Sequence, residues 1–128
     1  MLPSGILITQ PYAAFLVREP IYFMTTIPEK FETVIVVLDV PVRIKLTAEY
    51  KWNFGDGHKV VTDHPGAPYP IGRVRHTYLN PGEKQLSLEV VWTGTWSAGT
   101  ISGPIKGSMT TEFERKLMIR TADTRLNQ

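Results

Sequence analysis

Residues 42–57 read VRIKLTAEYKWNFGDG, and they join a long alternating run to a tight turn. Apolar side chains occupy every second position from Val42 to Phe54, and Arg, Lys, Thr, Glu or Asn stands at each position between them. Successive side chains of a strand point to opposite faces, so this period of two predicts a half-buried strand. The run is longer than an ordinary strand, and we expect a bend near Ala48.

Other segments of the chain also have sequence patterns that predict strands. Residues 84–92 alternate again, with Leu86, Leu88, Val90 and Trp92 on one face. Residues 33–38 are almost all β-branched, which favours a strand that is covered on both faces or is central in its sheet. Short apolar runs at 13–17 and 21–24 predict strands, and residues 109–120 predict a long final one, although Arg115 falls at an inward position.

The connections carry turn residues. Gly55-Asp56-Gly57 offers two residues that tolerate positive φ and a side chain that caps its own turn. Asn80-Pro81-Gly82 fits a type II turn ahead of the second alternating run. Residues 58–70 contain three prolines and cannot form a central strand, and residues 94–107 contain four glycines and are predicted to form a wide loop.

These features predict an all-β protein with an antiparallel β-sandwich. The 128 residues suit a single domain over 1–128, in which 46–92 carries the motifs and 1–31 and 93–128 supply flanking strands and the long loop. We find no helical periodicity of useful length and no repeat.

Composition excludes several classes of function. Cysteine is absent, which removes a disulfide scaffold, a thiolate zinc site and a Cys nucleophile. The formal net charge is only +2 and the basic residues are spread singly, so we expect no nucleic-acid partner. No apolar run approaches the ~20 residues of a membrane span, so we expect no membrane insertion.

Two turns and the strand that follows them carry a resemblance to a known family. The segment Tyr50 to Gly57 (YKWNFGDG), followed by His76 to Gly82 (HTYLNPG) and the alternating Leu86, Leu88 and Val90, resembles the polycystic kidney disease (PKD) domain. The hallmark of that family is W-D-F-G-D-G, then H-x-Y-x-x-P-G ahead of a strand. The resemblance covers about 46–92, while 15–39 and the insert 63–75 look like versions found on bacterial surface proteins.

The resemblance implies an immunoglobulin-like sandwich and structural roles for the motif residues. Trp52 and Phe54 would fill the space between the sheets, and Tyr78 would act as a tyrosine corner. His76 would pair with the first turn, in which Gly55, Asp56 and Gly57 reverse the chain, and Pro81 and Gly82 would form the second turn. Asn53 and Lys84 depart from the family pattern, where Asp and an aromatic residue are usual.

Metal sites have little support in the sequence. His58, His64 and His76 are six and twelve residues apart, which matches no familiar ligand spacing and favours solvated loop histidines. Calcium near Asp56, with Asn53, Asp63 and Asp39, is the one alternative, and no D-x-D-x-D-G motif supports it. We therefore expect no metal or cofactor.

Catalytic constellations are also missing from the sequence. No serine lies in G-x-S-x-G or beside a histidine, and Glu112 and Glu114 share a strand face with nothing that ties them to a pocket. The expectation is a protein that is not an enzyme.

Trp96 and Tyr69 are the candidate ligand-binding residues, because flat exposed rings suit stacking on sugars or insertion into a partner. Trp96 could instead fold back on its own sheet.

The expected function is that of a bacterial cell-surface or secreted module serving protein–protein interaction or structural spacing, and the alternative is carbohydrate binding through Trp96 and Tyr69. The partner would be a protein or a glycan. Weak self-association through sheet edges, at 33–38 or along the strand that ends near Ile119, is a further expectation.

Overall fold

A computed structural model describes residues 2–121, and it contains strands and no helix over that range. The all-β prediction is therefore confirmed. The strands in chain order are β1 (Leu7–Gln10), β2 (Phe15–Leu16), β3 (Pro20–Thr25), β4 (Lys30–Val37), β5 (Val40–Asn53), β6 (Lys59–Thr62), β7 (Arg75–Thr77), β8 (Gly82–Ala98), β9 (Ile101–Pro104) and β10 (Met109–Arg120).

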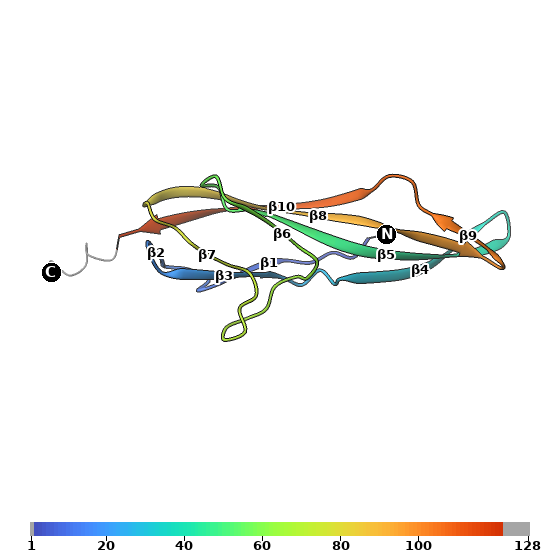
Figure 1. Cartoon of the computed structure of the whole chain (residues 1–128), viewed down its shortest axis with the longest axis horizontal. Coiled ribbons are helices and arrows are strands. Elements are labelled where there is room, and N and C mark those ends of the chain that lie inside the picture. Colours follow the sequence, from blue (N-terminus) through green and yellow to red (C-terminus); the bar gives the residue numbers. More distant parts are fainter. Residues whose placement is uncertain (1, 122–128) are drawn as a thin grey trace.

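The strands form two sheets (Figure 1). The smaller sheet has the order β1-β3-β7 and is antiparallel. The larger has the order β2-β10-β8-β5-β4, with β6 added on β5 and β9 on β8. β2 runs parallel to β10, so the larger sheet is mixed, whereas the sequence predicted antiparallel pairing throughout. Only Phe15 and Leu16 make this parallel pairing, which is too short to show as a pattern in the sequence.

The hydrophobic core lies where the two sheets face each other. Phe23 of β3 meets Phe54 and Trp52 at the end of β5, with ring centroids 5.0 and 6.3 Å away. The alternating side chains predicted to point inward on β8 are all fully buried: Leu86, Leu88, Val90 and Trp92. Both large alternating runs therefore supply one wall of the core, as predicted.

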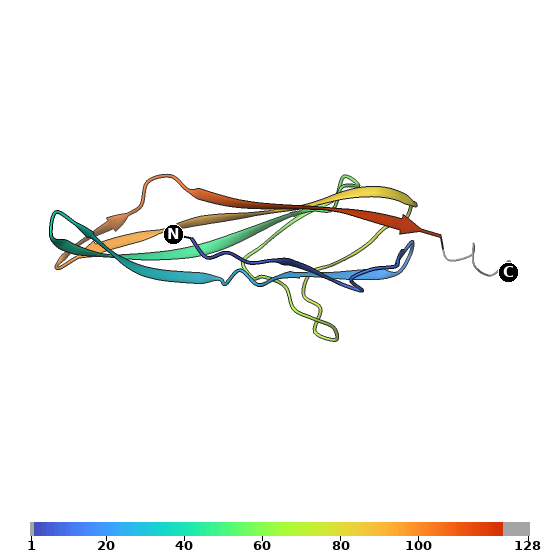
Figure 2. The ribbon, with the colours of Figure 1, turned by 180° about the vertical axis from the view of Figure 1, so that it is seen from behind.

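The two sheets differ in length, and one end of the molecule is a single layer (Figures 1 and 2). Along β5, the inward side chains are buried from Leu46 onward, but Val42 and Ile44 are only half-buried. We call the part beyond this point, residues 34–45 and 94–104, the distal arm. The alternation of apolar and polar residues continues into the distal arm, where the inward side chains Val42 and Ile44 are still half-buried.

Residues 94–107 are not a wide loop, which corrects the prediction from the sequence. β8 continues to Ala98, and β9 turns back to pair with it. The glycine at 94 marks a close approach of two strands: a Cβ there would lie 1.9 Å from the backbone oxygen of Lys45. Gly94 is thus required for packing within the sheet, and its presence in the sequence does not indicate a loop.

β4 is an edge strand, and from Val34 to Val37 both of its faces are exposed. The expectation of a central or doubly covered strand is therefore wrong, and the expectation of a sheet edge is confirmed. Its β-branched composition fits a strand in either setting.

β10 spans Met109–Arg120, as predicted, and Arg115 has a specific role there. Its guanidinium donates to Thr9 Oγ1 at 3.2 Å and to the carbonyl of Tyr12 at 2.7 Å, and it lies 6.0 Å from the ring of Phe15. The inward arginine therefore links the two sheets at the margin of the core.

Candidate functional site

The turn between β5 and β6 positions the most distinctive polar cluster. Gly55 and Gly57 have φ values of 84° and 96°, which only glycine adopts without strain. The side chain of Asn53 accepts a bond from Gly55 N at 3.0 Å, and Asp56 Oδ1 accepts one from His58 N at 3.2 Å. Asn53 therefore still caps the turn although it departs from the family pattern.

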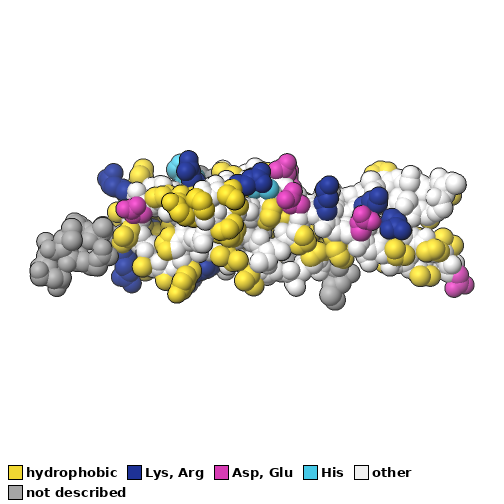
Figure 3. All heavy atoms as spheres, turned by 90° about the horizontal axis from the view of Figure 1, so that it is seen from below, with side chains coloured by type: hydrophobic (Ala, Val, Ile, Leu, Met, Phe, Trp, Pro, Cys, Tyr) yellow, Lys and Arg dark blue, Asp and Glu magenta, His cyan; other side chains and the backbone are white. Residues whose placement is uncertain are grey.

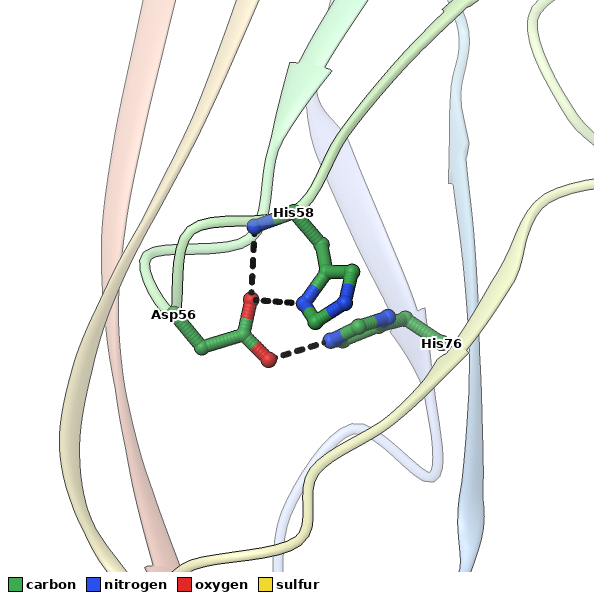
Figure 4. Close-up of side chains that lie close together, drawn as sticks. All are labelled: Asp56, His58 and His76. Carbon is green, nitrogen blue, oxygen red and sulfur yellow. Dashed lines mark hydrogen bonds and ion pairs between the residues drawn. The ribbon is translucent and has the colours of Figure 1, made fainter.

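Asp56, His58 and His76 point toward one another across the gap between this turn and β7 (Figure 4). His76 Nε2 lies 2.6 Å from Asp56 Oδ2, and His58 Nδ1 lies 3.3 Å from Asp56 Oδ1. The side chains of His76 and Asp56 are 13% and 18% exposed, whereas that of His58 is 72% exposed. His76 is therefore not a solvated loop histidine, which corrects that part of the prediction.

Aromatic contacts fix the plane of the His76 ring. Phe54 stacks on it with a centroid separation of 4.3 Å and an angle of 5°, and Tyr78 meets it edge-on at 4.7 Å. Tyr78 in turn donates its hydroxyl to the buried carbonyl of Phe54 at 2.7 Å. Burial and the nearby Asp56 carboxylate raise the pKa of Tyr78 above its ordinary value.

The charge on Asp56 is stabilised locally. Burial opposes its ionisation, but the bonds from His76 and His58 outweigh that cost and hold the pKa of the carboxyl below its usual value. Asp56 is therefore an ionised acceptor facing two imidazoles.

The remaining motif residues serve packing and turns. Trp52 is 1% exposed and donates Nε1–H to Thr62 Oγ1 at 3.2 Å. Gly82, which follows Pro81 and begins β8, has a φ of 124°. Trp52 is therefore a core residue, and Gly82 has a positive φ that favours glycine.

Among residues 2–121, the other metal-ligand sets considered from the sequence do not come together. Asp39 and Asp56 lie beyond opposite ends of the fourteen-residue β5. His64 lies in the β6–β7 connection, where its Nδ1 accepts a bond from Gly66 N at 3.2 Å. The cluster at Asp56 therefore contains His58 and His76, and neither Asp39 nor Asp63 belongs to it.

Trp96 and Tyr69 lie in different parts of the molecule. Trp96 is half-buried on β8, with its ring against Gly103 of β9, so it folds back on its own hairpin. Tyr69 is 67% exposed in the β6–β7 connection, where its ring meets that of Tyr22 at 5.7 Å. The structure does not combine the two rings into one platform.

The distal arm carries an exposed apolar surface (Figure 3). Large apolar side chains that are 46% to 93% exposed cover the end of β4, the turn and the first residue of β5: Val34, Ile35, Val36, Val37, Leu38 and Val40. Both faces of the strand contribute, since neighbours in sequence point to opposite faces.

Within residues 2–121, one hydrogen-bonding edge of β4 has no neighbouring strand. The Ala48 N–H bonds to the Glu29 carbonyl at 2.9 Å. In an antiparallel ladder the two backbone groups of one residue point to the same side, and the side alternates along the strand. Residues 31, 33, 35 and 37 therefore face β5, whereas Lys30, Glu32, Val34 and Val36 direct their N–H and C=O groups outward.

The turn at the tip of the distal arm is strained. Leu38 and Asp39 connect Val37 to Val40, and they have φ values of 50° and 66°. Two positive values define the type I′ hairpin turn, which strongly favours Asn-Gly. Leucine at such a position costs about 1 kcal/mol, and Leu38 is 93% exposed.

No family model, curated protein or solved structure matches this chain. Within residues 2–121 there is also no helix of the length and apolarity that a membrane span requires.

Sequence reasoning missed two of these features. His58 and His76 are eighteen residues apart, and the pairing of β7 with β3 holds His76 where it meets the turn that carries His58. The expected contact of His76 with the first turn was the available signal. The exposure of β4 could not be read from composition, because buried and exposed β-branched strands have the same residues.

Proposed function

We propose that this protein is a non-catalytic, PKD-like module with an immunoglobulin-like fold, and that it binds another protein through the distal arm. The observation that carries the proposal is the exposed apolar strand β4 with its outward edge. An exposed, apolar edge strand is a template for pairing with another chain, and natural proteins usually block such edges with charge, proline or a covering segment.

The partner that fits is an extended apolar segment that adds to the sheet beside β4. The backbone groups of Lys30, Glu32, Val34 and Val36 would form hydrogen bonds with this segment. Successive apolar side chains of the segment would pack beside the apolar side chains on the two faces of β4. The charged residues of this edge stand at its beginning, next to the two-layer body, so the outer half is wholly apolar.

The strained tip supports the same proposal. Leu38 lowers the stability of the hairpin and gains no burial within the chain. Strained residues that the fold does not need are found where a protein binds other molecules.

The proposed setting is a bacterial cell surface or a secreted protein, in line with the resemblance to PKD domains. Structural spacing is compatible with this setting, since the two sheets and the distal arm form an elongated body (Figure 1). Pairing of β4 with a second copy of the chain is the competing use of the edge.

The test compares capture of a partner by the wild type, Val36→Lys and Val61→Lys. Val61 is 59% exposed on β6 and is the matched control, because the same charge enters a different exposed strand. The partner is first captured from cells that express the chain and is then purified. In titrations, its affinity for Val36→Lys should be at least about tenfold lower than for the wild type, whereas its affinity for Val61→Lys should be unchanged. Equal affinity for all three proteins would overturn the proposal.

Sedimentation equilibrium of the purified chain separates the competing use. The proposal predicts the monomer mass of 14.4 kDa at all concentrations used for titration. A dimer that Val36→Lys dissociates would instead assign the edge to a second copy.

Carbohydrate binding is the weaker alternative, because Trp96 lies against Gly103 and Tyr69 packs on Tyr22, so the two rings do not form one platform. A glycan that binds the wild type and is lost in Tyr69→Ala or Trp96→Ala would favour it over protein binding.

A further inference from the structure

We infer that Asp56, His58 and His76 form a binding site for a divalent transition metal of the zinc class. The inference is independent of the proposed function, because the site lies at the opposite end of β5 from the distal arm. Among the described residues, these three form the cluster in which one carboxylate oxygen and two imidazole nitrogens lie within 4.8 Å of one another.

The distances suit a small ion after a limited movement. Ligand atoms ~2.0 Å from a tetrahedral Zn²⁺ stand about 3.3 Å apart. His58 Nδ1 lies 3.3 Å from Asp56 Oδ1, whereas His76 Nε2 lies 2.6 Å from the other oxygen, Oδ2, so the carboxylate would bind an ion through both oxygens or turn to present one. An ion would replace the proton shared by the latter pair and widen it slightly. His58, which is 72% exposed, is free to adjust.

The two less exposed ligands are held in place before any ion binds. Phe54 and Tyr78 fix the ring of His76, and the glycine-flanked turn holds Asp56 through the His58 N–H. A site whose ligands are already ordered loses less conformational entropy on binding.

The ligand types select the class of metal. Imidazole nitrogens suit Zn²⁺, Cu²⁺ and Ni²⁺, whereas Ca²⁺ and Mg²⁺ require sets of oxygen ligands. The cluster opens on a hollow of about 350 Å³, which leaves room for water at a fourth coordination position. Lys84 lines the same hollow, and its positive charge opposes the ion. We therefore expect moderate affinity.

Such an ion would link the two sheets. Asp56 and His58 follow β5 of the larger sheet, and His76 belongs to β7 of the smaller. In a chain without cysteine, this would be a crosslink between layers, and binding to the folded state alone would raise the melting temperature.

The experiment is calorimetric titration of the full chain with ZnCl₂, with thermal melts at the same concentrations. The wild type should bind about one equivalent and melt at a higher temperature with zinc. His58→Ala and Asp56→Asn should lower the affinity at least about tenfold. His64→Ala is the matched control and should bind like the wild type, because His64 lies outside the cluster.

His58→Ala is the decisive variant, because His58 is mostly exposed and its loss leaves the core intact. Unchanged circular dichroism confirms that it folds. The inference is overturned if the wild type gives no zinc heat, if His58→Ala binds zinc like the wild type, or if CaCl₂ shifts the melting temperature as much as ZnCl₂ does.

Discussion

The backbone N–H of Ala48 bonds to the carbonyl of Glu29 at 2.9 Å, and this bond sets the pairing phase of β4 on β5. Further along the chain, Phe54 N bonds to the carbonyl of His58 at 3.1 Å, on the side where β6 pairs with β5. Ala48 and Phe54 are six residues apart, so the same alternation of bonding sides along β5 accounts for both bonds. Val34 and Val36 consequently direct their backbone groups away from the sheet. This edge is the basis of the proposed interaction surface.

The double substitution Leu38→Asn with Asp39→Gly should stabilise the protein while it weakens partner binding. Asn-Gly relieves the positive φ values of the turn, and we expect a gain of about 1 kcal/mol in the free energy of unfolding. Urea denaturation measures the gain, and titration of the purified partner measures the loss. A double variant that is less stable than the wild type would show that the turn is not strained.

Gly94→Ala should destabilise the protein by about 1 to 3 kcal/mol, because the added methyl would overlap the backbone of Lys45. Thr95→Ala, at an exposed neighbouring position, is the control and should cost no more than about 0.5 kcal/mol. If Gly94→Ala unfolds at the same urea concentration as Thr95→Ala, residues 94–98 are not packed on β5.

Tyr78→Phe should lower the free energy of unfolding by about 1 to 3 kcal/mol, because the buried carbonyl of Phe54 loses its donor. Tyr12, which is 78% exposed, provides the control Tyr12→Phe, for which we expect little change. Equal stability of the two variants would contradict the tyrosine-corner role.

Stability should fall in alkaline solution as buried tyrosines ionise. Burial, with a smaller contribution from Glu29, raises the pKa of Tyr50 from 10.0 to about 12. The unfolded chain therefore loses this proton first, and the stabilisation is complete below about pH 10 and lost as the pH rises toward about 12. Tyr50→Phe should flatten the fall in unfolding free energy over this window. The same slope in variant and wild type would contradict the assignment.

The sequence predicted the parts of the fold that depend on local pattern. The alternation around Trp52 and Leu88 placed both strands and their buried faces, and the glycines around Asp56 placed the turn. Gly94 was wrongly assigned to a loop, because glycine occurs both in loops and where two strands approach closely, and the residue type alone does not distinguish the two settings. The His58–His76 contact depends on tertiary pairing, and the exposure of β4 depends on how far the smaller sheet extends, so neither could be derived from local pattern.

Hydrogen exchange at individual amides of β4 tests the central claim most directly. In the isolated chain, the amides of Val34 and Val36 should exchange quickly and those of Thr33, Ile35 and Val37 slowly, and addition of the purified partner should protect Val34 and Val36. Slow exchange of Val34 and Val36 in the dilute, isolated chain, or no added protection in the complex, would contradict the account.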